Sequence, residues 1–409
     1  MSDVKKLPLE GVRVLDFGHT VMGPTCGMIL ADLGADVIKV EPLEGDRTRR
    51  LKGFGTGYFG YLNRNKRSIS VNLKSAEGLE VVRKLIETAD VIVENFAPGT
   101  MDRLSLGYEH VKAVNPRLIY ASLKGFMDGP YKNRLALDEV VQMMTGLAYM
   151  TGPTGRPLRA GTSVVDITGG MFALIAILVA LRERDRSGQG QKVETALFEA
   201  AVMLMGQHLC YGAQLQAPVP PMPERVSAWA VYEIFEVAGG RQLFMGITSD
   251  RHWQRFCAQV GRPDLLDNPA YATNESRIDA RGTLIPELAS ILQSMTLDEA
   301  VAVCEQAQIP FSPINRPEDL LDDPHLRATD GLLETTLPNG VKARLPRLPI
   351  EMGGQKFGLR NDPPAVGQDT RALLAELGID ETRAEALRAA GAIRFHEATD
   401  LTGAERASL

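Results

Sequence analysis

The sequence predicts an α/β protein: a large lobe with a mostly parallel, helix-covered sheet, and a smaller α+β lobe joined to it by long linkers. Three observations support this fold class. Short apolar runs alternate with helical patterns from residue 12 to residue 123, which is typical of β-α-β units. A proline-rich stretch at 212–223 interrupts the chain, and hairpin patterns follow it. At 409 residues, the chain also exceeds the usual size of one domain.

The first part of the chain predicts five strands and two helices. The strands are expected at 12–17, 37–40, 68–73, 90–94 and 118–123, and the helices at 24–33 and 76–88. Ligands of such sheets bind outside the carboxyl ends of strands, where this chain has His19, Glu41, Asn95 and Lys124. The turn after the first strand, GHTVMGP, lacks the G-x-G-x-x-G fingerprint, which argues against a dinucleotide site.

The central feature is an apolar run from Ile167 to Leu181 that begins directly after Asp166. It is shorter than the roughly 20 residues that span a bilayer, so we expect a buried core helix that is apolar all round. The carboxyl at its start has two compatible interpretations. Asp166 could cap the helix, or it could be a nucleophile that helix N–H groups hold ionised. In the second case Gly161, Gly169 and Gly170 would let a bulky substrate approach the backbone.

The remaining chain predicts a second lobe and a return to the first. A hairpin is expected over 231–237 and 242–247, a second one around 338–340, and helices over 251–260, 284–294, 297–307 and 369–377. We therefore predict the large α/β lobe over 1–212, the linker and small domain over 213–325, and the return to the large lobe over 326–409. Residues beyond about 393 are polar and are expected to be mobile.

Composition narrows the classes of function. The net charge is −6 and basic residues form no long run, which argues against a nucleic-acid surface. Four cysteines are widely spaced without C-x-x-C pairs, so we expect reduced core thiols and no metal site. The first ten residues lack an apolar signal core. We therefore expect a cytoplasmic protein that binds neither nucleic acid nor membrane.

Eight stretches, in order, carry a resemblance to a known family. They are GVRVLDFGHTVMGP, GADVIKVEP, NKRSISVNLK, ENFAPGTMDRLSLGY, SLKGF, LDEVVQMMTG, RAG-x4-D-I-x-G-G and G-Q-G-Q-K-V. Together they resemble the class III coenzyme A transferases of the formyl-CoA transferase and carnitine CoA-transferase type, from about residue 8 to residue 390. Each stretch alone is a weak signal, but their shared order is a strong one.

The resemblance implies that Asp166 is the catalytic nucleophile. Its carboxylate would attack acyl-CoA to give a mixed anhydride and coenzyme A thiolate, and the thiolate would convert the anhydride into an aspartyl-CoA thioester. An Asp with the ordinary pKa of about 3.9 is ionised at neutral pH and needs no general base. Backbone N–H groups of the glycine-rich turns could stabilise the oxyanions. The family also implies two chains interlocked as a homodimer.

The resemblance further implies which residues hold coenzyme A, a substrate and not a permanently bound cofactor. The adenine end would be contacted by Val71, Asn72, Leu73 and Lys74. The pantetheine and phosphate region would be held by Asn95, Phe96 and Arg103. A further part of the pocket would be formed by His19, Thr20 and Val21. Leu135 and Asp138 would lie on the substrate side. Asp138 could equally be a helix cap, His19 a strand-end residue, and Arg103 and Lys74 solvated surface groups.

The chain differs from the family pattern in places, and two other functions are alternatives. No G-G-G-G run is present to cover the intermediates, so segment 241–250 is the alternative shield, and Leu135 stands where the formyl branch has Lys. A racemase of the same fold needs His before the acid, where this chain has Leu137. A non-enzymatic acyl-CoA binder would not need Asp166.

Within the transferases, residues 122–161 look most like the mesaconyl-CoA C1–C4 branch, which moves coenzyme A within one dicarboxylate. Arg134, Arg156 or Arg159 would then hold the distal carboxylate. An intermolecular transferase with succinyl-CoA as donor is the alternative.

Overall fold

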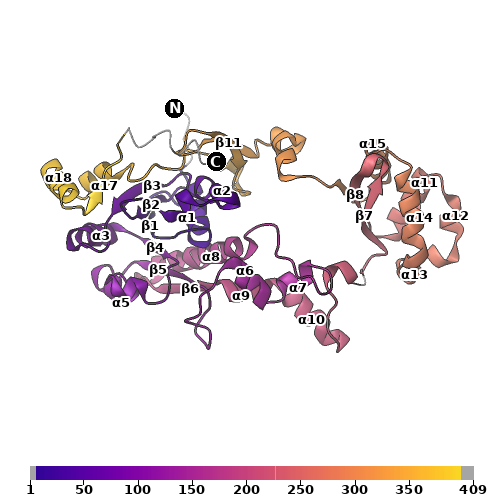
Figure 1. The fold of residues 1–409 in the computed structure, drawn as a ribbon, viewed down its shortest axis with the longest axis horizontal. Coiled ribbons are helices and arrows are strands. Elements are labelled where there is room, and N and C mark those ends of the chain that lie inside the picture. The colour runs from indigo at the N-terminus through magenta and orange to yellow at the C-terminus, as the bar shows by residue number, and fades with distance from the viewer. Residues whose placement is uncertain (1–5, 226, 398–409) are drawn as a thin grey trace. The chain divides into compact units, whose positions relative to one another are not determined.

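The protein is described by a computed structural model that covers residues 6–225 and 227–397. The chain divides into two compact units (Figure 1). Unit 1 comprises Met1–Pro223 and Thr329–Leu409, and unit 2 comprises Glu224–Ala328. The predicted α/β class with a mostly parallel sheet is confirmed. The linker was predicted to begin near residue 213, but the chain there is still in helix α10 (Gly206–Leu215).

Unit 1 is built on one seven-stranded sheet. Its order is β14-β3-β2-β1-β4-β5-β6, and every neighbouring pair is parallel except β14 with β3. The chain adds β2 and β3 on one side of β1, then returns to place β4 on the other side, so the topological switch point lies between β1 and β4. The strands are β1 (Arg13–Asp16), β2 (Asp36–Glu41), β3 (Arg67–Val71), β4 (Val91–Glu94), β5 (Ile119–Lys124), β6 (Lys192–Ala196) and β14 (Ile393–Arg394).

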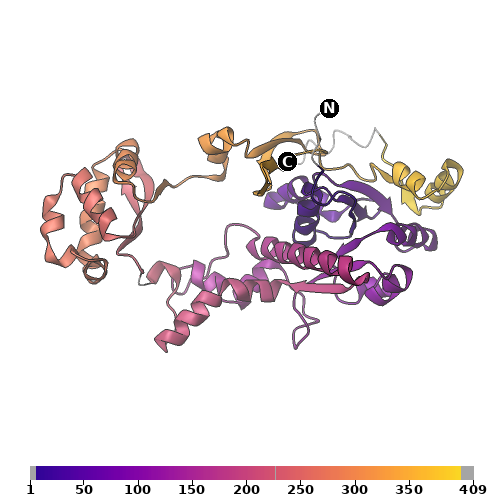
Figure 2. The same ribbon diagram turned by 180° about the vertical axis from the view of Figure 1, so that it is seen from behind.

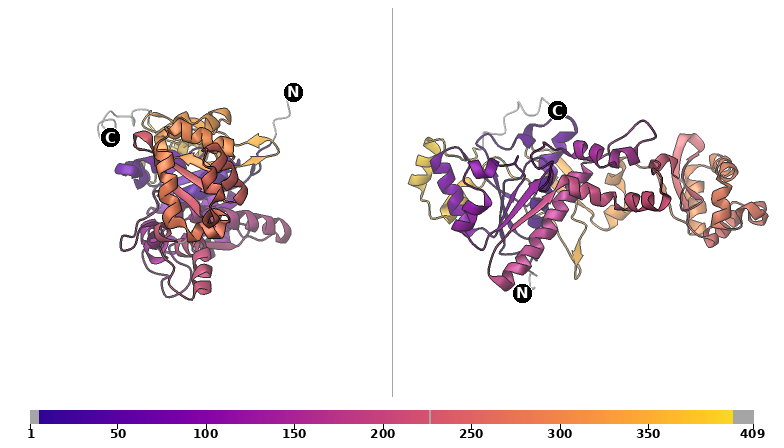
Figure 3. Two further views of the ribbon diagram at one scale, coloured as in Figure 1. Left: turned by 90° about the vertical axis from the view of Figure 1, so that its right-hand side faces the viewer. Right: turned by 90° about the horizontal axis from the view of Figure 1, so that it is seen from below.

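Helices cover both faces of this sheet (Figure 3, right) because successive strand residues point to opposite sides. Val14 of β1 packs in a core with α1, α8 and α9, whereas its neighbour Leu15 packs in a second core with α3, α5, α17 and α18. The helices of unit 1 are α1 (Met22–Asp32), α2 (Thr56–Leu62), α3 (Ala76–Thr88), α4 (Thr100–Arg103), α5 (Tyr108–Val114), α6 (Asp138–Met144), α7 (Leu147–Thr151), α8 (Val164–Ser187), α9 (Leu197–Leu204), α10, α17 (Thr370–Glu376) and α18 (Glu381–Ala389).

Helix α8 is the predicted core helix on one face only. It lies along β5 and β6 and against α1 (Figure 2), and its buried Arg184 donates to Asp90 at 2.8 Å. The helix is long and apolar enough to cross a membrane by length and composition, but these contacts are those of a core helix. Its other face exposes Met171, Ile175 and Val179, each about half or more accessible. The apolar pattern is present all round, but one chain buries only part of it.

Unit 2 contains a three-stranded antiparallel sheet covered by helices. The predicted hairpin is confirmed as β7 (Val231–Val237) and β8 (Arg241–Ile247), with Val237 opposite Arg241, and β9 (Phe311–Pro313) pairs with β8. The core centres on Trp253, Phe256 and Cys304. The helices are α11 (Asp250–Gln259), α12 (Pro263–Asp267), α13 (Asn274–Asp279), α14 (Arg281–Gln293), α15 (Leu297–Ala307) and α16 (Pro324–Ala328).

The chain after residue 329 completes unit 1. The second predicted hairpin is confirmed as β10 (Leu332–Thr336) with β11 (Lys342–Pro346), and β12 (Glu351–Met352) pairs with β13 (Gln355–Lys356). Short 3-10 turns complete the described chain: η1 (Arg47–Arg50), η2 (Gly53–Gly55), η3 (Met222–Glu224), η4 (Ala238–Gly240), η5 (Pro269–Tyr271) and η6 (Pro317–Asp322).

Two expectations for the C-terminal region were wrong. Helix α17 does not close the fold, because α18 follows and β14 then pairs with β3, Ile393 opposite Val71. The tail predicted to be mobile from about residue 393 therefore begins with a strand whose Ile393 is buried. Residues 398–409 lie outside the described part of the chain.

Cys210, expected in the core, is exposed on α10, whereas Cys26, Cys257 and Cys304 are buried.

Candidate active site

The carboxyl ends of β1 and β4 meet at the switch point, and local hydrogen bonds brace the turn after each strand. Asp16 Oδ1 accepts from Gly18 N at 2.7 Å, and Glu94 Oε2 accepts from Phe96 N at 3.0 Å. Across the two strands, His19 N donates to Asn95 Oδ1 at 2.9 Å and Asn95 Nδ2 donates to His19 O at 3.0 Å. His19 and Asn95 are 76 positions apart, and both were named from the sequence as strand-end residues. The structure brings them into direct contact.

Two of the four strand-end residues named from the sequence are already engaged elsewhere. Glu41 is buried and binds Arg49 at 2.7 Å and Ser68 Oγ at 2.6 Å. Lys124 binds the buried Glu94 carboxylate at 2.7 Å. Glu41 is thus held by Arg49 of η1 and Lys124 by Glu94 of β4, and a ligand-lining role for these two side chains stays a prediction.

The His19 ring is half-buried between polar and aromatic neighbours. Its centroid lies 5.5 Å from that of Phe96, and Nδ1 lies 3.1 Å from Thr20 Oγ1. Burial lowers the pKa of His19 below 6.5, and the negative charge of Asp46 opposes that shift only in part. The imidazole is therefore neutral at pH 7 and can donate or accept a hydrogen bond, but it brings no positive charge to an anionic ligand.

Asp138 caps helix α8 from a different helix. It is the first residue of α6, 7% exposed, and its Oδ2 accepts from Val165 N at 2.8 Å and from Asp166 N at 3.0 Å. Its Oδ1 accepts from Gln142 Nε2, whose own Oε1 accepts from Ala160 N at 2.8 Å. The helix-cap interpretation was therefore right for Asp138, although the helix that it caps is not its own.

Asp166 does not cap α8, because it lies inside the first turn and Ser163 occupies the N-cap position. The first-turn N–H donors of the helix already have partners: Val164 N donates to Thr162 O, Val165 N and Asp166 N donate to Asp138, and Ile167 N donates to Ser163 O. The Asp166 carboxylate is half-buried and accepts no hydrogen bond from residues 6–225 or 227–397.

The electrostatic state of Asp166 also differs from the prediction. Burial raises its pKa from 3.8 to about 7, and the nearby charge of Asp138 adds to that shift. The expectation of an ordinary acidic pKa stabilised by helix N–H groups was wrong, since those groups are already bound. A carboxylate without hydrogen-bond donors is poorly stabilised, so its ionised form is a stronger nucleophile than a solvated aspartate.

The glycines near Asp166 serve helix packing more than substrate access. A Cβ on Gly169 would lie 2.6 Å from the Met22 side chain, and one on Gly170 would lie 2.6 Å from Met22 O. Glycine at both positions therefore lets α8 pack closely against α1. Only Gly161, which is exposed with nothing near its missing Cβ, leaves the backbone open as predicted.

Tyr58 is a neighbour of the site that no sequence pattern indicated. Its hydroxyl lies 3.1 Å from Ser163 Oγ at the start of α8, and Phe54 packs edge-on against its ring at 5.3 Å. No spacing rule connects these residues, since Tyr58 and Ser163 are 105 positions apart. The Gln142 contact had a local signal, because Gln142 follows Asp138 at the i+4 spacing of one helix face.

The residues predicted to hold coenzyme A lie at the carboxyl edge of the sheet but differ in accessibility. Val71 is fully buried, and the Asn72 side chain donates to Gly391 O and accepts from Lys74 N. Lys74 and Arg103 are exposed, and neither forms an ion pair within the described chain. Both cations can therefore reach an anionic ligand, whereas Val71 offers only its backbone. Thr20, Val21, Leu73 and Phe96 are partly or fully buried, Val21 at the N-cap of α1.

The arginines proposed for a distal carboxylate are not equivalent. Arg159 binds Glu139 and stacks on Phe54, and Arg134 lies over Tyr131 at 4.8 Å. Arg156 is exposed and has no acidic partner among the residues that the structure describes. Leu135 is 84% exposed, so its substrate role stays a prediction.

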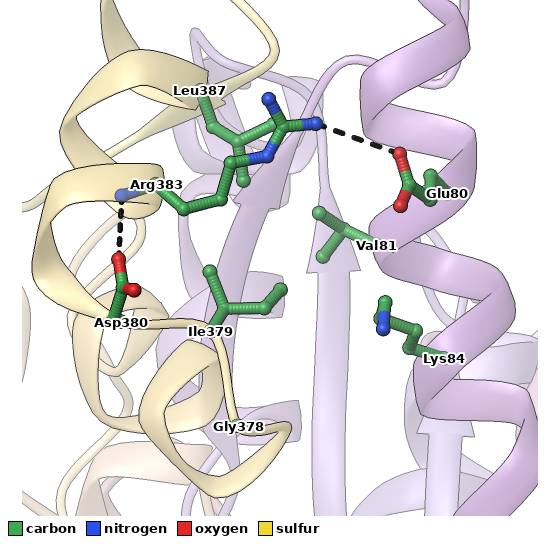
Figure 4. Close-up of a pocket in the computed structure, with 8 residues that line it drawn as sticks. All are labelled: Glu80, Val81, Lys84, Gly378, Ile379, Asp380, Arg383 and Leu387. Atoms are coloured by element: carbon green, nitrogen blue, oxygen red, sulfur yellow. Dashed lines mark hydrogen bonds and ion pairs between the residues drawn. The ribbon is translucent and has the colours of Figure 1, made fainter.

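A surface hollow of about 240 Å³ lies elsewhere, between α3 and α18 (Figure 4). Its lining combines apolar side chains with charged ones of both signs, among them an ion pair between Arg383 and Glu80 at 3.7 Å. None of the predicted site residues contributes to it, so it is separate from the candidate active site.

Known proteins similar to this chain match it along nearly its whole length. The model of CoA-transferase family III matches residues 9–370. An acyl-CoA transferase of Fusarium pseudograminearum is 37% identical over 91% of this chain and 85% of its own length. The succinate–glutarate CoA-transferase of Agrobacterium fabrum is 34% identical over 92% and 98%. A crystal structure of a CAIB/BAIF family protein from Brucella suis is 32% identical with a TM-score of 0.81, covering 91% of this chain and all of that one.

Proposed function

The chain belongs to CoA-transferase family III, and from that membership we propose that it transfers coenzyme A between carboxylates through an aspartyl-CoA thioester on Asp166. One observation carries the assignment to this residue. Asp166 presents a half-buried carboxyl at the start of α8 that has no hydrogen-bond partner among the described residues, and its pKa is raised to about 7. A structural carboxylate would instead be paired or capped, as Asp138 is.

The proposed reaction has four covalent steps. Asp166 attacks the acyl carbonyl of acyl-CoA, and the C–S bond breaks to release coenzyme A thiolate from a mixed anhydride. The thiolate attacks the aspartyl carbonyl, which releases the first carboxylate and leaves the aspartyl thioester. A second carboxylate attacks this thioester to form a new anhydride and thiolate. The thiolate then attacks the new acyl carbon and regenerates the Asp166 carboxylate.

Asp138 acts on this chemistry through position and charge. Its two hydrogen bonds hold the first turn of α8, and its carboxylate raises the pKa of Asp166. At pH 7, about half of the Asp166 side chains are ionised. Transfer therefore needs no separate base, but its rate depends on pH near neutrality.

Coenzyme A carries several negative charges, and two exposed cations support its binding at the carboxyl edge of the sheet. Arg103 can form a bidentate contact with a phosphate, while Lys74 offers a point charge. His19 stays neutral and contributes hydrogen bonds only. We propose that the adenine and phosphate groups lie along these residues and that the thioester points toward α8.

For the acyl group we propose a small dicarboxylate. Arg156 is exposed and has no acidic partner within the described part of the chain, which supports recognition of a distal carboxylate. The sequence predicts intramolecular C1–C4 transfer on mesaconyl-CoA. The relative named for succinate and glutarate supports the intermolecular alternative, in which succinyl-CoA donates to a second dicarboxylate.

One assay separates these versions. Mesaconyl-C1-CoA is incubated without acceptor, and succinyl-CoA is incubated with glutarate or mesaconate, each with wild-type protein and Asp166→Asn. Isomerisation without acceptor supports the intramolecular version, and product formation only with acceptor supports the intermolecular one. Hydroxylamine or borohydride added during turnover should modify Asp166 in either case. Full turnover by Asp166→Asn would refute the proposal.

Racemisation is the rival chemistry on this fold. It needs an imidazole beside the acid, and Leu137 is an exposed aliphatic residue at the N-cap of α6. Rapid loss of an α-deuteron from a branched acyl-CoA would overturn the transferase proposal.

We also propose an interlocked homodimer in the cytoplasm. The exposed apolar face of α8, continued by Met203 on α9, supports burial against a second chain. The four unpaired cysteines are compatible with a reducing compartment. Light scattering during size-exclusion chromatography measures the mass of the protein in solution. A mass equal to that of one chain would contradict the proposed dimer.

A further inference from the structure

The turn after β1 holds an unusual backbone conformation that needs support. Thr20 has φ of 64°, in the left-handed region that a β-branched residue rarely adopts. It stands between His19, which is bound to Asn95, and Val21, which is the N-cap of α1. Residues persist in such conformations only where the surroundings over-determine them.

A chain of three buried side chains supplies that support, and we call it the Lys39–Asp46–Thr48 clamp. Thr20 N donates to Thr48 Oγ1 at 3.0 Å, and Thr48 Oγ1 donates to Asp46 Oδ1 at 2.8 Å. Asp46 Oδ2 binds Lys39 Nζ at 2.8 Å, and Lys39 Nζ donates to Gly18 O at 2.6 Å. The clamp therefore begins and ends on the same turn, at Gly18 O and at Thr20 N.

The chemistry of each member fits this task. The Thr48 hydroxyl accepts from Thr20 and donates to Asp46 at once, which neither an aliphatic nor an acceptor-only group can do. Lys39, Asp46 and Thr48 are at most 7% exposed, so water does not substitute for their contacts. A buried ion pair by itself is weak evidence for a stabilising role. The pair of Lys39 and Asp46, however, is hydrogen-bonded to the turn that carries His19 and Thr20, directly through Lys39 and by way of Thr48.

We propose that Thr48, held by Asp46 and Lys39, is a positioning residue that fixes the Gly18–Thr20 turn in its ligand-binding conformation. The inference rests on the proposed function, since it takes this turn to be part of the coenzyme A site. Asn95 completes the support from β4 by binding both backbone groups of His19. The turn is thereby fixed before coenzyme A arrives, which reduces the ordering cost of binding.

The test compares Thr48→Val with Thr48→Ser. Valine keeps the shape but loses both hydrogen bonds, whereas serine keeps the hydroxyl. Thr335→Val is the matched control, because Thr335 is also buried and its hydroxyl also bonds to the backbone, on the β10 strand. We expect Thr48→Val to speed hydrogen exchange in peptides covering residues 17–22 and to weaken coenzyme A binding about tenfold in calorimetry. Serine should restore both, and Thr335→Val should change neither.

The readouts separate the possible failures. Unchanged exchange in Thr48→Val would show that the clamp does not hold the turn. Faster exchange with unchanged coenzyme A affinity would show that the turn is held but that its conformation does not matter for binding. Either result overturns the inference. If wild-type protein bound no coenzyme A, the proposed function would fail and the positioning role would fail with it.

Discussion

Replacing Asp166 with Asn should make the folded protein more stable at neutral pH while it removes the proposed nucleophile. The folded protein raises the pKa of Asp166 from 3.8 to about 7, so its carboxyl prefers the protonated form when folded. Below pH 3.8 the group is protonated in both states and costs nothing. As the pH rises toward 7, the unfolded chain ionises first, and the folded state loses relative stability.

The magnitude follows from about 1.4 kcal/mol per pKa unit. Ionisable Asp166 should destabilise unit 1 by about 4 kcal/mol at pH 8 and by about 1.6 kcal/mol at pH 5. The first figure is an upper bound, because the side chain is half-buried and water screens part of the charge. An Asn of the same shape cannot ionise, so Asp166→Asn should gain up to these amounts.

Urea unfolding followed by far-UV circular dichroism at pH 5 and pH 8 measures this gain. Both tryptophans, Trp229 and Trp253, lie in unit 2, so their fluorescence reports that unit separately. The expected result is a gain in the free energy of unfolding that is larger at pH 8 than at pH 5. A variant no more stable than wild type at pH 8, or an equal gain at both values, would refute the raised pKa.

Three further predictions follow from the same geometry. The transfer rate should fall about tenfold per pH unit below pH 7 as Asp166 becomes protonated. Asp138→Asn removes a negative charge beside Asp166, so it should move this fall in rate to lower pH. A pH–rate profile without that shift would show that the charge of Asp138 does not raise the pKa of Asp166. Arg103→Gln should raise the KM for acyl-CoA about 10- to 100-fold with little change in kcat. The control variant Arg83→Gln, on the exposed face of α3, should leave the KM unchanged. Equal KM values for the two variants would show that Arg103 does not bind acyl-CoA. Ile175→Glu on the exposed face of α8 should dissociate the proposed dimer in light-scattering measurements, and an unchanged mass would argue against that interface.

Local signals in the sequence were sufficient for several elements of both units. Helices α3 and α15 begin and end where expected, at Ala76–Thr88 and Leu297–Ala307, because each has a side-chain cap before its first residue, Ser75 and Thr296. The hairpin of β7 and β8 could be predicted from glycines between two β-rich runs. Strand β14 could not, because its two residues become a strand only by pairing with β3, more than three hundred positions earlier.

The candidate site divides in the same way. The sequence alone identified Asp166 as the central carboxyl and His19 and Asn95 as strand-end residues, since strand ends and helix starts have local signatures. Only the tertiary structure decided that Asp138 takes the helix donors which Asp166 would otherwise use, and that burial then raises the pKa of Asp166. It likewise decided that Gly169 and Gly170 face α1 and that one face of α8 stays exposed. The physical reason is that hydrogen-bond partners, desolvation and packing are set by residues distant in sequence, which no local pattern encodes.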